Sequence, residues 1–294
     1  EKRGCGNDAD HVLLHLEHID ENTLKKRLPG ISETAKIFAG VDLTKNPIPV
    51  LPTVHYNMGG IPTNYQTEVL CPTKDDPNNI CEGLMAVGEA ACVSVHGANR
   101  LGTNSLIDLI VFGKSASITA KKKVKKNSLK IDIKKSVTEE ILDRFDNILH
   151  NSGGLSTGEL RISMQKIMQK NCAVFRSHEL ISKGIRKFNE VEVSLDNLEI
   201  KDKSLIFNTD LVEALELHNL MSQSKATLHS ALNRTESRGA HAREDFTQRD
   251  DEKWLVHSLI WLGENGSVRF GNRPVNMNTM TNEVQSILPK KRVY

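Results

Sequence analysis

The segment at residues 96–108, HGANRLGTNSLID, gathers a histidine, an arginine, two glycines and several small polar residues directly before an apolar run. A helix that begins here would offer N–H groups without intrahelical partners and a partial positive charge of about half a unit. Arg100 would add a planar fork of hydrogen-bond donors. The segment therefore predicts an anion-binding site, with a capped loop of no chemical role as the open alternative.

Two further segments carry side chains of types that bind ligands. In HYNMGGIPTN, Gly59 and Gly60 permit close approach of the backbone to a flat ligand, and His55 offers a donor beside them. Glu89 is expected at the end of a buried strand, where a carboxylate can accept from sugar hydroxyls, as acidic residues do in dinucleotide sites. Arg100 is of the residue type that pairs bidentately with a substrate carboxylate.

Composition narrows the class of protein. With 294 residues, of which 38% are hydrophobic, the chain can form one large or two smaller globular domains. Its 39 basic and 37 acidic residues give a net charge of +2, so no nucleic-acid partner is expected. Five cysteines without a CxxC pair favour a reducing compartment over a disulfide framework. No apolar stretch reaches the roughly 18 residues that span a bilayer, and no N-terminal signal pattern is present.

Three early histidines suggest a metal site at first sight. The alternation in HVLLHL predicts a half-buried strand, on which His11 and His15 would stand about 13 Å apart. One ion cannot bridge that distance, so a solvated strand is favoured for His11, His15 and His18, and no metal site is predicted. The chain starts without methionine and enters this strand almost at once, which we interpret as a piece of a longer polypeptide.

The spacing of apolar residues and the positions of proline and glycine predict the elements that position the candidate residues. ETAKIFAG predicts a short helix that ends at Gly40, and three prolines in residues 46–53 predict an extended connector between domains. Residues 104–123 predict a buried helix, because its first turns are apolar nearly all round. Ser105 and Asp108 have the spacing of a capping box for this helix.

The second half of the chain is expected to be mainly helical. The lysine-rich stretch 121–135 is interpreted as a solvated tether, because no aromatic residue is interleaved with its lysines. Ser136, Ser156 and Asp210 each precede a glutamate by three residues, which predicts three capped helices. Leucine and methionine stripes at helical spacing predict an antiparallel bundle. WLVHSLIWL, the turn GENG and SVRF then predict a terminal hairpin.

The charge run RTESRGAHAREDF allows two interpretations. Its charged residues could form a solvated ion network or take part in catalysis directly. We favour the solvated network, because mixed-sign surface runs are common and individually weak. The residues concerned are Arg234, Glu236, Arg238, Arg243, Glu244 and Asp245.

Four motifs together resemble one known family. PTVHYNMGGIPTN, GLMAVGEAACVSVHGANRLGTNSLIDLIVFG, TDLVEALELHNLM and TESRGAHAREDF are similar to the flavoprotein family of succinate dehydrogenases and fumarate reductases. The resemblance runs from the first residue to the last, and it covers the C-terminal half of the family only. Several motifs of ten or more residues match, which makes the resemblance specific.

The resemblance implies roles for five residues. His55 resembles the histidine that holds a carboxyl group of a dicarboxylate, and Arg100 resembles the arginine that grips the same substrate beside the flavin. Glu89 resembles the residue bonded to the FAD ribose, and Ser105 and Leu106 match positions whose backbone meets the pyrimidine edge of the isoalloxazine ring. A helix N-terminus there would stabilise the negative charge that develops when flavin accepts hydride. The flavin-linking histidine and the proton-shuttle arginine are expected upstream, so no catalytic residue is predicted within the chain.

The resemblance also implies an α/β plus α fold. The expected parts are a partial FAD-binding, Rossmann-like domain with the remainder of a capping domain, then a helical bundle domain and a small C-terminal α+β domain. The expected bounds are 1–52 for the end of the capping domain, 53–130 for the FAD-binding part, 131–236 for the helical domain and 237–294 for the C-terminal domain.

The implied activity is the oxidation of succinate to fumarate by hydride transfer to FAD. Electrons would then pass to an iron-sulfur subunit and on to quinone through a complex with membrane anchor subunits, in the tricarboxylic acid cycle and respiratory chain. Such a subunit would lie peripherally on the inner membrane, at the mitochondrial matrix face or the cytoplasmic face of a bacterium. A fumarate reductase and a truncated, non-catalytic fragment remain as alternatives, and L-aspartate oxidase is a more remote relative.

Overall fold

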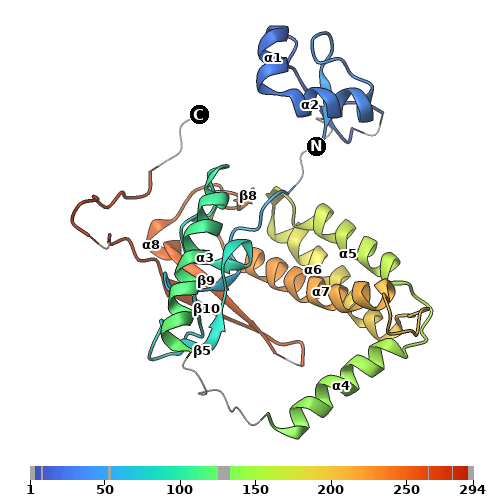
Figure 1. Cartoon of the computed structure of the whole chain (residues 1–294), viewed down its shortest axis with the longest axis vertical. Coiled ribbons are helices and arrows are strands. Elements are labelled where there is room, and N and C mark those ends of the chain that lie inside the picture. The colour runs from blue at the N-terminus through green and yellow to red at the C-terminus, as the bar shows by residue number, and fades with distance from the viewer. Residues whose placement is uncertain are drawn as a thin grey trace. The chain divides into compact units, whose positions relative to one another are not determined.

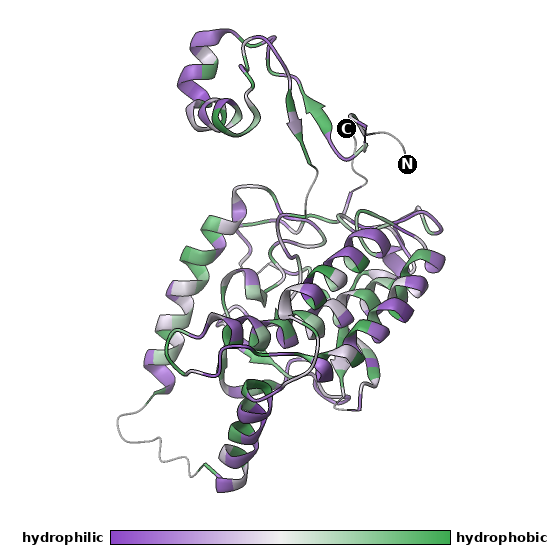
Figure 2. Cartoon of the chain, turned by 90° about the vertical axis from the view of Figure 1, so that its right-hand side faces the viewer, coloured by the Kyte–Doolittle hydropathy of each residue, from purple (hydrophilic) through white to green (hydrophobic). Residues whose placement is uncertain are grey.

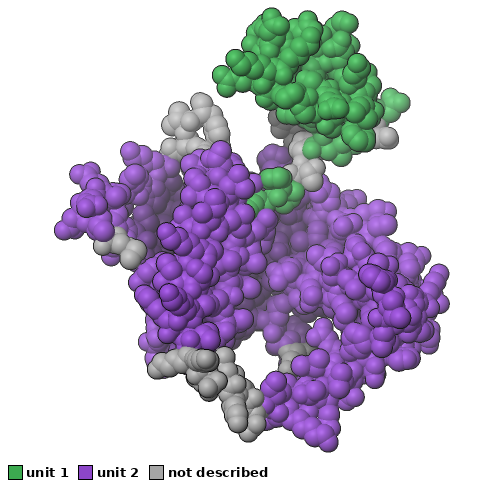
Figure 3. Space-filling view, viewed as in Figure 1, with its two compact units in different colours: residues 1–56 green, residues 57–294 purple. Residues whose placement is uncertain are grey.

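The computed structural model describes residues 4–7, 9–51, 54–124, 133–263, 265–279 and 281–290. The chain divides into two compact units, Glu1–Tyr56 and Asn57–Tyr294 (Figure 3). This boundary lies a few residues after the connector predicted at 46–53. The four-domain assignment itself stays a prediction.

Unit 1 is a two-stranded ribbon with a short helical segment. Its elements are β1 (Val12–Leu14), α1 (Glu21–Arg27), α2 (Pro29–Thr34), the π-helical turn η1 (Ala35–Ala39) and β2 (Ile48–Val50), with β1 and β2 antiparallel. Asp20 begins α1 by accepting from the Thr23 N–H at 3.0 Å, and Gly40 ends η1 in the left-handed conformation at φ 67°. The predicted strand and the helix end at Gly40 are therefore confirmed.

The predicted burial of one face of β1 is wrong. Val12, Leu13 and Leu14 are all exposed, and only Leu16, beyond the strand, packs against the unit's core. A ribbon of two three-residue strands is too small to cover either of its own faces. The core of the unit comes instead from four side chains of its helices, a loop and the start of β2: Leu24, Ala35, Leu43 and Ile48.

The strands of unit 2 pair two by two. β3 (Ile61–Pro62) is parallel to β6 (Ala91–Cys92), β4 (Glu68–Leu70) is antiparallel to β5 (Ile80–Met85), and a 3₁₀ turn η2 (Gly88–Ala90) precedes β6. All three residues of β4 are buried. The part of the chain that the structure describes holds no larger sheet, so the mixed α and β composition is confirmed while a Rossmann-like layer is not seen.

Helix α3 (Asn104–Lys123) has the predicted bounds but not the predicted burial. Leu106 is 69% exposed and Ile110 is 73% exposed, and Figure 2 shows apolar bands along this helix. Gly88 packs closely against Leu109, but most other apolar side chains of α3 are exposed. No helix among the described residues is long and apolar enough to cross a membrane.

The antiparallel bundle is confirmed and forms the main core. α5 (Thr157–Asn171), α6 (His178–Val193) and α7 (Thr209–Asn233) pack together (Figure 1). α4 (Lys135–Leu149) joins them through its last turn, and a 3₁₀ turn η3 (Ser194–Asn197) follows α6. The predicted leucine and methionine stripes supply many of the core side chains, including Leu160, Met164, Leu211, Leu217, Met221 and Leu228.

One of the three predicted caps of the bundle helices is confirmed. Ser156 and Glu159 form a capping box at the start of α5. α4 begins after Lys134 without a side-chain cap, so the prediction for Ser136 is wrong. The predicted cap at Asp210 is also wrong, since Asn208 caps α7. Asp210 lies inside the helix and accepts from the Lys201 N–H. Residues 125–132 of the predicted tether lie outside the described residues.

The C-terminal part joins the bundle to the predicted hairpin, which is confirmed. β9 (Val256–Leu262) pairs antiparallel with β10 (Val268–Pro274), and α8 (Asp251–Trp254) precedes β9. β7 (Phe175–Arg176) pairs in parallel with β8 (Ala242–Arg243) and ties the charge run to the bundle.

Candidate functional site

Arg100 lies against the first turn of α3. Its Nη1 donates to the Gly102 carbonyl oxygen at 3.1 Å and to the Ser105 hydroxyl oxygen. Leu106, the next residue of the helix, is exposed. The first N–H groups of an α-helix have no intrahelical acceptor, so a guanidinium and the positive end of a helix dipole meet here. The structure therefore brings Arg100, Ser105 and Leu106 together, as an anion site requires.

The capping box predicted from Ser105 and Asp108 is wrong. α3 has Thr103 at its N-cap position with no side-chain cap bond, which makes Ser105 the second residue of the helix. Asp108 instead pairs with His96, at 3.2 Å between Oδ2 and Nε2, and both side chains are nearly buried. This pair fastens the loop before Arg100 to α3. His96 and Asp108 are twelve residues apart with a loop between them, so no local sequence pattern predicts that they pair.

Glu89 lies in the 3₁₀ turn η2 and not at the end of a buried strand, which corrects the prediction. Its Oε1 accepts from the Asn57 N–H at 2.9 Å, so Glu89 holds the glycine loop that follows Asn57. A carboxylate has about four lone-pair sites, and this bond uses one of them.

The two glycines of that loop serve different purposes. Both have positive φ, 114° for Gly59 and 116° for Gly60, which side chains rarely tolerate. A Cβ at Gly60 would stand 2.5 Å from the Ala90 carbonyl oxygen, so Gly60 is needed for packing against η2. A Cβ at Gly59 would meet no atom within 4 Å, so open space at Gly59 fits the close approach of a flat ligand.

His55 is exposed and lies at the end of unit 1. The other four candidates belong to unit 2, so the structure does not place His55 relative to them. No group of three or more His, Cys, Asp and Glu side chains in the described ranges could hold a metal ion.

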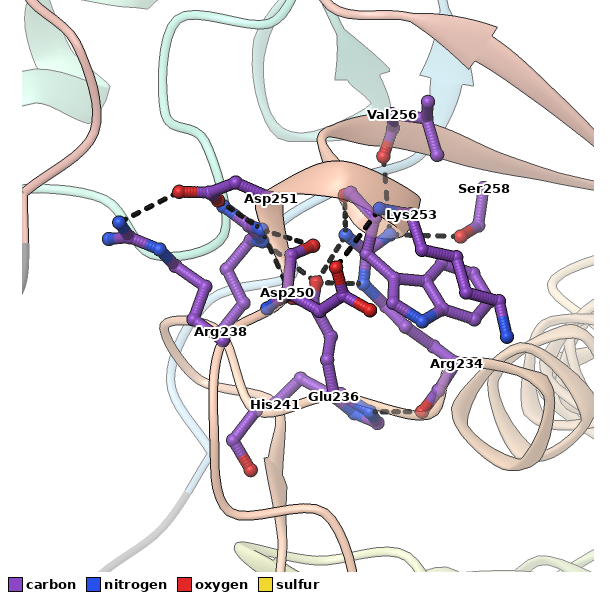
Figure 4. Close-up of polar contacts among 12 residues, drawn as sticks. Arg234, Glu236, Arg238, His241, Asp250, Asp251, Lys253, Val256 and Ser258 are labelled. Atoms are coloured by element: carbon purple, nitrogen blue, oxygen red, sulfur yellow. Dashed lines mark hydrogen bonds and ion pairs between the residues drawn. The ribbon is translucent and has the colours of Figure 1, made fainter.

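The charge run at 234–246 forms the predicted ion network, but the predicted solvation is wrong for its centre, because Glu236 and Arg243 are buried while Glu244 and Asp245 are exposed. The Glu236 side chain is 0% exposed and accepts from Arg234 at 2.6 Å and from Arg238 at 2.7 Å (Figure 4). The Asp250 N–H adds a third donor at 2.9 Å. Burial acts to raise the pKa of Glu236, but the hydrogen bonds from Arg238, the Asp250 N–H and Arg234 outweigh it and hold the pKa below its usual value.

Arg243 is the second buried charge of this segment. Its Nη1 donates to the carbonyl oxygens of Ala231 and Leu232 at 3.0 and 3.2 Å, in the last turn of α7. A cation there complements the helix dipole. The other guanidinium nitrogens pair bidentately with Asp245 at 2.8 Å, which lowers the pKa of Asp245 to about 2.

His241 lies between the two arginine groups as a neutral side chain. Its Nε2 bonds the Arg234 carbonyl oxygen at 3.0 Å, and its Nδ1 accepts from Arg176 at 2.8 Å. This pattern needs a proton on Nε2 and none on Nδ1. Burial, with help from the nearby guanidinium charges, lowers the pKa of His241 to about 4.

Stability is therefore expected to fall as the pH drops from about 6.5 to 4. In this window the unfolded chain protonates His241 and the folded chain does not, so acid favours unfolding by at most about 3 kcal/mol. Urea unfolding at pH 7 and pH 5 should show this loss in the wild type. His241→Gln keeps an uncharged donor but cannot take up the proton, so its loss of stability between these pH values should be smaller. An equal loss in both proteins would contradict the assignment.

A turn of the charge run contacts the loop of Arg100. The Ala240 N–H donates to the Ala98 carbonyl oxygen at 3.0 Å. Gly239 has a φ of 58°, and a Cβ on it would stand 2.5 Å from the same oxygen. The turn at 239–240 and the loop at 96–102 are thus in direct backbone contact.

Comparison with known proteins places this geometry in a family. Residues 161–294 match the family model described as fumarate reductase flavoprotein C-term, and residues 1–106 match the FAD binding domain model. A succinate dehydrogenase flavoprotein subunit of Rickettsia conorii is 53% identical over the whole chain and 49% of the relative's length. The mitochondrial succinate dehydrogenase flavoprotein subunit of Oryza sativa subsp. japonica is 52% identical over the whole chain and 46% of its own length.

Fumarate reductases are similar at a lower level. The fumarate reductase flavoprotein subunit of Proteus vulgaris is 38% identical over 97% of the chain and 46% of its own length. Among solved structures, a quinol fumarate reductase of E. coli matches with a TM-score of 0.83 at 36% identity, over 99% of the chain and 47% of that structure. The chain spans about half the length of the curated relatives it matches. It belongs to the flavoprotein family of succinate dehydrogenases and fumarate reductases.

Proposed function

We propose that the chain is part of a flavoprotein subunit that oxidises succinate to fumarate and passes the electrons on toward quinone. The observation that carries this proposal is the contact of Arg100 with the first turn of α3. It provides a fixed guanidinium for a carboxylate beside a helix N-terminus, where developing negative charge is stabilised. The sequence around this contact is the part that most resembles the family.

The residues present fit FAD. The backbone of Ser105 and Leu106 would face the pyrimidine edge of the ring, and Glu89 would accept from the ribose while retaining its bond to Asn57. The open space at Gly59 supports close approach of a flat group. When bound, the flavin supplies the hydride acceptor that the protein's own side chains lack.

The side chains of this chain would bind and orient the substrate. Arg100 would pair with one carboxylate of succinate, and His55 would hold a carboxyl group of the same molecule. Fixing the dicarboxylate fixes the C–H bond that gives up hydride. No residue of this chain is assigned the proton transfer, which we attribute to an arginine outside it.

The dehydrogenase direction is favoured over fumarate reduction. The relatives named succinate dehydrogenase reach 53% identity, whereas the relative named fumarate reductase in Proteus vulgaris reaches 38%. The loop HYNMGGIPTN also favours the dehydrogenase by resemblance. We propose an iron-sulfur subunit and membrane anchor subunits as partners, and a peripheral position on the inner membrane of a mitochondrion or bacterium.

The experiment that tests this function starts from the protein in its native source. The purified protein is expected to show the visible absorption of bound flavin, and anaerobic succinate should bleach that absorption. A flavoprotein that only fumarate reoxidises, and that succinate does not reduce, would favour the reductase. A colourless polypeptide with the mass of this chain alone would favour the non-catalytic fragment.

A further inference from the structure

The contact between Ala98 and the turn at 239–240 links the charge network to the anion site. Ala98 lies two residues before Arg100, and its carbonyl oxygen accepts the Ala240 N–H at 3.0 Å. Gly239 lies so close to the same oxygen that a methyl group on it would clash with the backbone of Ala98. This backbone cannot move aside as the end of a flexible side chain could.

The buried ion network fixes this turn from its base. Arg238 and His241 exchange two backbone hydrogen bonds across the turn, at 2.8 and 3.0 Å. The Arg238 guanidinium, only 15% exposed, is held by Glu236 at 2.7 Å and by Asp251 at 2.7 Å. A fully buried carboxylate with paired arginines does not shift easily, because each unpaired charge would be costly.

Several hydrogen bonds fasten the loop before α3, and at its start Ser94 Oγ bonds His257 Nε2 of β9 at 2.8 Å. Three further bonds lie closer to Arg100. His96 is bonded to Asp108, Ala98 to Ala240, and Arg100 to Ser105. Two of these anchors belong to α3 itself, and the middle one comes from a segment about 140 residues later in the chain. The middle anchor therefore connects the C-terminal part to the backbone two residues before Arg100.

We propose that Gly239, through the turn held by Arg238 and Glu236, is a positioning residue that sets the guanidinium of Arg100 for a dicarboxylate. This inference rests on the proposed function of Arg100. The proposed role of the network is indirect. The network fixes the backbone that carries Arg100, and bidentate pairing with a carboxylate depends strongly on that geometry.

The test is Gly239→Ala in the full-length, flavin-loaded protein, with malonate as the dicarboxylate probe. Calorimetry is expected to show malonate binding weakened about tenfold or more, since small misplacements of a binding group cost this much. Flavin content should be retained. Hydrogen–deuterium exchange of residues 96–102, which needs neither flavin nor activity, should become faster.

Gly153→Ala is the matched control. A Cβ at Gly153 would stand 2.1 Å from the Asn197 carbonyl oxygen, an equally severe backbone clash inside the helical part. This variant is expected to lower the melting temperature while leaving malonate affinity unchanged. If Gly239→Ala is not recovered folded, Arg238→Lys keeps the charge, loses the fork and should shift malonate affinity in the same direction by a smaller factor.

The outcomes separate the two proposals. Wild-type affinity in Gly239→Ala, or an equal loss in Gly153→Ala, would overturn the positioning role while leaving the function of Arg100 intact. Failure of the wild-type protein to bind malonate would overturn the proposed function and the positioning role with it. The exchange rates of residues 96–102 would still decide whether the turn holds the loop.

Discussion

Arg100→Ala is expected to lower kcat/KM for succinate by about 30- to 4,000-fold while flavin remains bound. Removing one partner of a hydrogen-bonded charge pair costs about 2–5 kcal/mol, and each 1.4 kcal/mol is a tenfold change in rate. The flavin should remain because the ring is proposed to meet the backbone of Ser105 and Leu106, which the substitution leaves in place. Steady-state oxidation of succinate with an artificial electron acceptor measures the loss, and the visible spectrum reports the flavin.

Two control variants test whether the loss is specific to the guanidinium of Arg100. Arg100→Lys keeps the charge without the planar fork, and an intermediate loss is expected because a lysine cannot pair bidentately. Arg269→Ala removes an arginine that stacks on Trp261 in the terminal hairpin, and it should leave succinate kinetics unchanged. Activity of Arg100→Ala within tenfold of the wild type would remove the argument for Arg100 as the carboxylate ligand.

The features that sequence predicted well are those decided by neighbouring residues. The bounds of α3, the left-handed Gly40, the capping box of Ser156 and the terminal hairpin all depend on contacts within a few positions along the chain. Periodicity also identified the bundle core, because a stripe at helical spacing has one plausible use in a soluble bundle.

The features that sequence missed depend on distant partners. Ser105 was predicted to cap α3 with Asp108, but the Arg100 guanidinium and the His96 ring take these two side chains. Burial of α3 was inferred from its apolar composition, although burial depends on what covers a helix and not on its residues alone. Ala98 and Ala240 are more than 140 positions apart in the sequence, so no local pattern predicts their contact.

The charge run carries a sequence signal that favours an ion network. Arg234, Glu236 and Arg238 alternate in sign at a spacing of two, which in an extended chain puts all three side chains on one face. That arrangement favours pairing within the segment over separate solvation. The roles of His55, Arg100, Glu89, Ser105 and Leu106 stay predictions, although the structure brings the Arg100, Ser105 and Leu106 group together.

Glu236→Ala is expected to lower the free energy of unfolding by about 3–5 kcal/mol. The substitution leaves Arg234 and Arg238, each 15% exposed, without the carboxylate that both contact. Arg238 keeps its pair with Asp251, so the main cost is the Arg234 guanidinium, which stays largely desolvated without a carboxylate. Urea unfolding at pH 7 measures the loss. Glu244→Ala removes an exposed carboxylate of the same segment, and its effect should stay within about 0.5 kcal/mol.

The pH dependence of this loss identifies its cause. The pKa of Glu236 is held below its usual value in the folded chain, so its carboxylate stabilises the fold above the unfolded pKa of about 4.3 and loses this contribution as the pH falls further. The difference between wild type and Glu236→Ala should therefore be constant from pH 7 to about 5 and shrink in stronger acid. A loss below about 1 kcal/mol at pH 7 would mean that the two arginines regain water when the carboxylate is removed, and that the turn beside Arg100 is held by packing and not by charge.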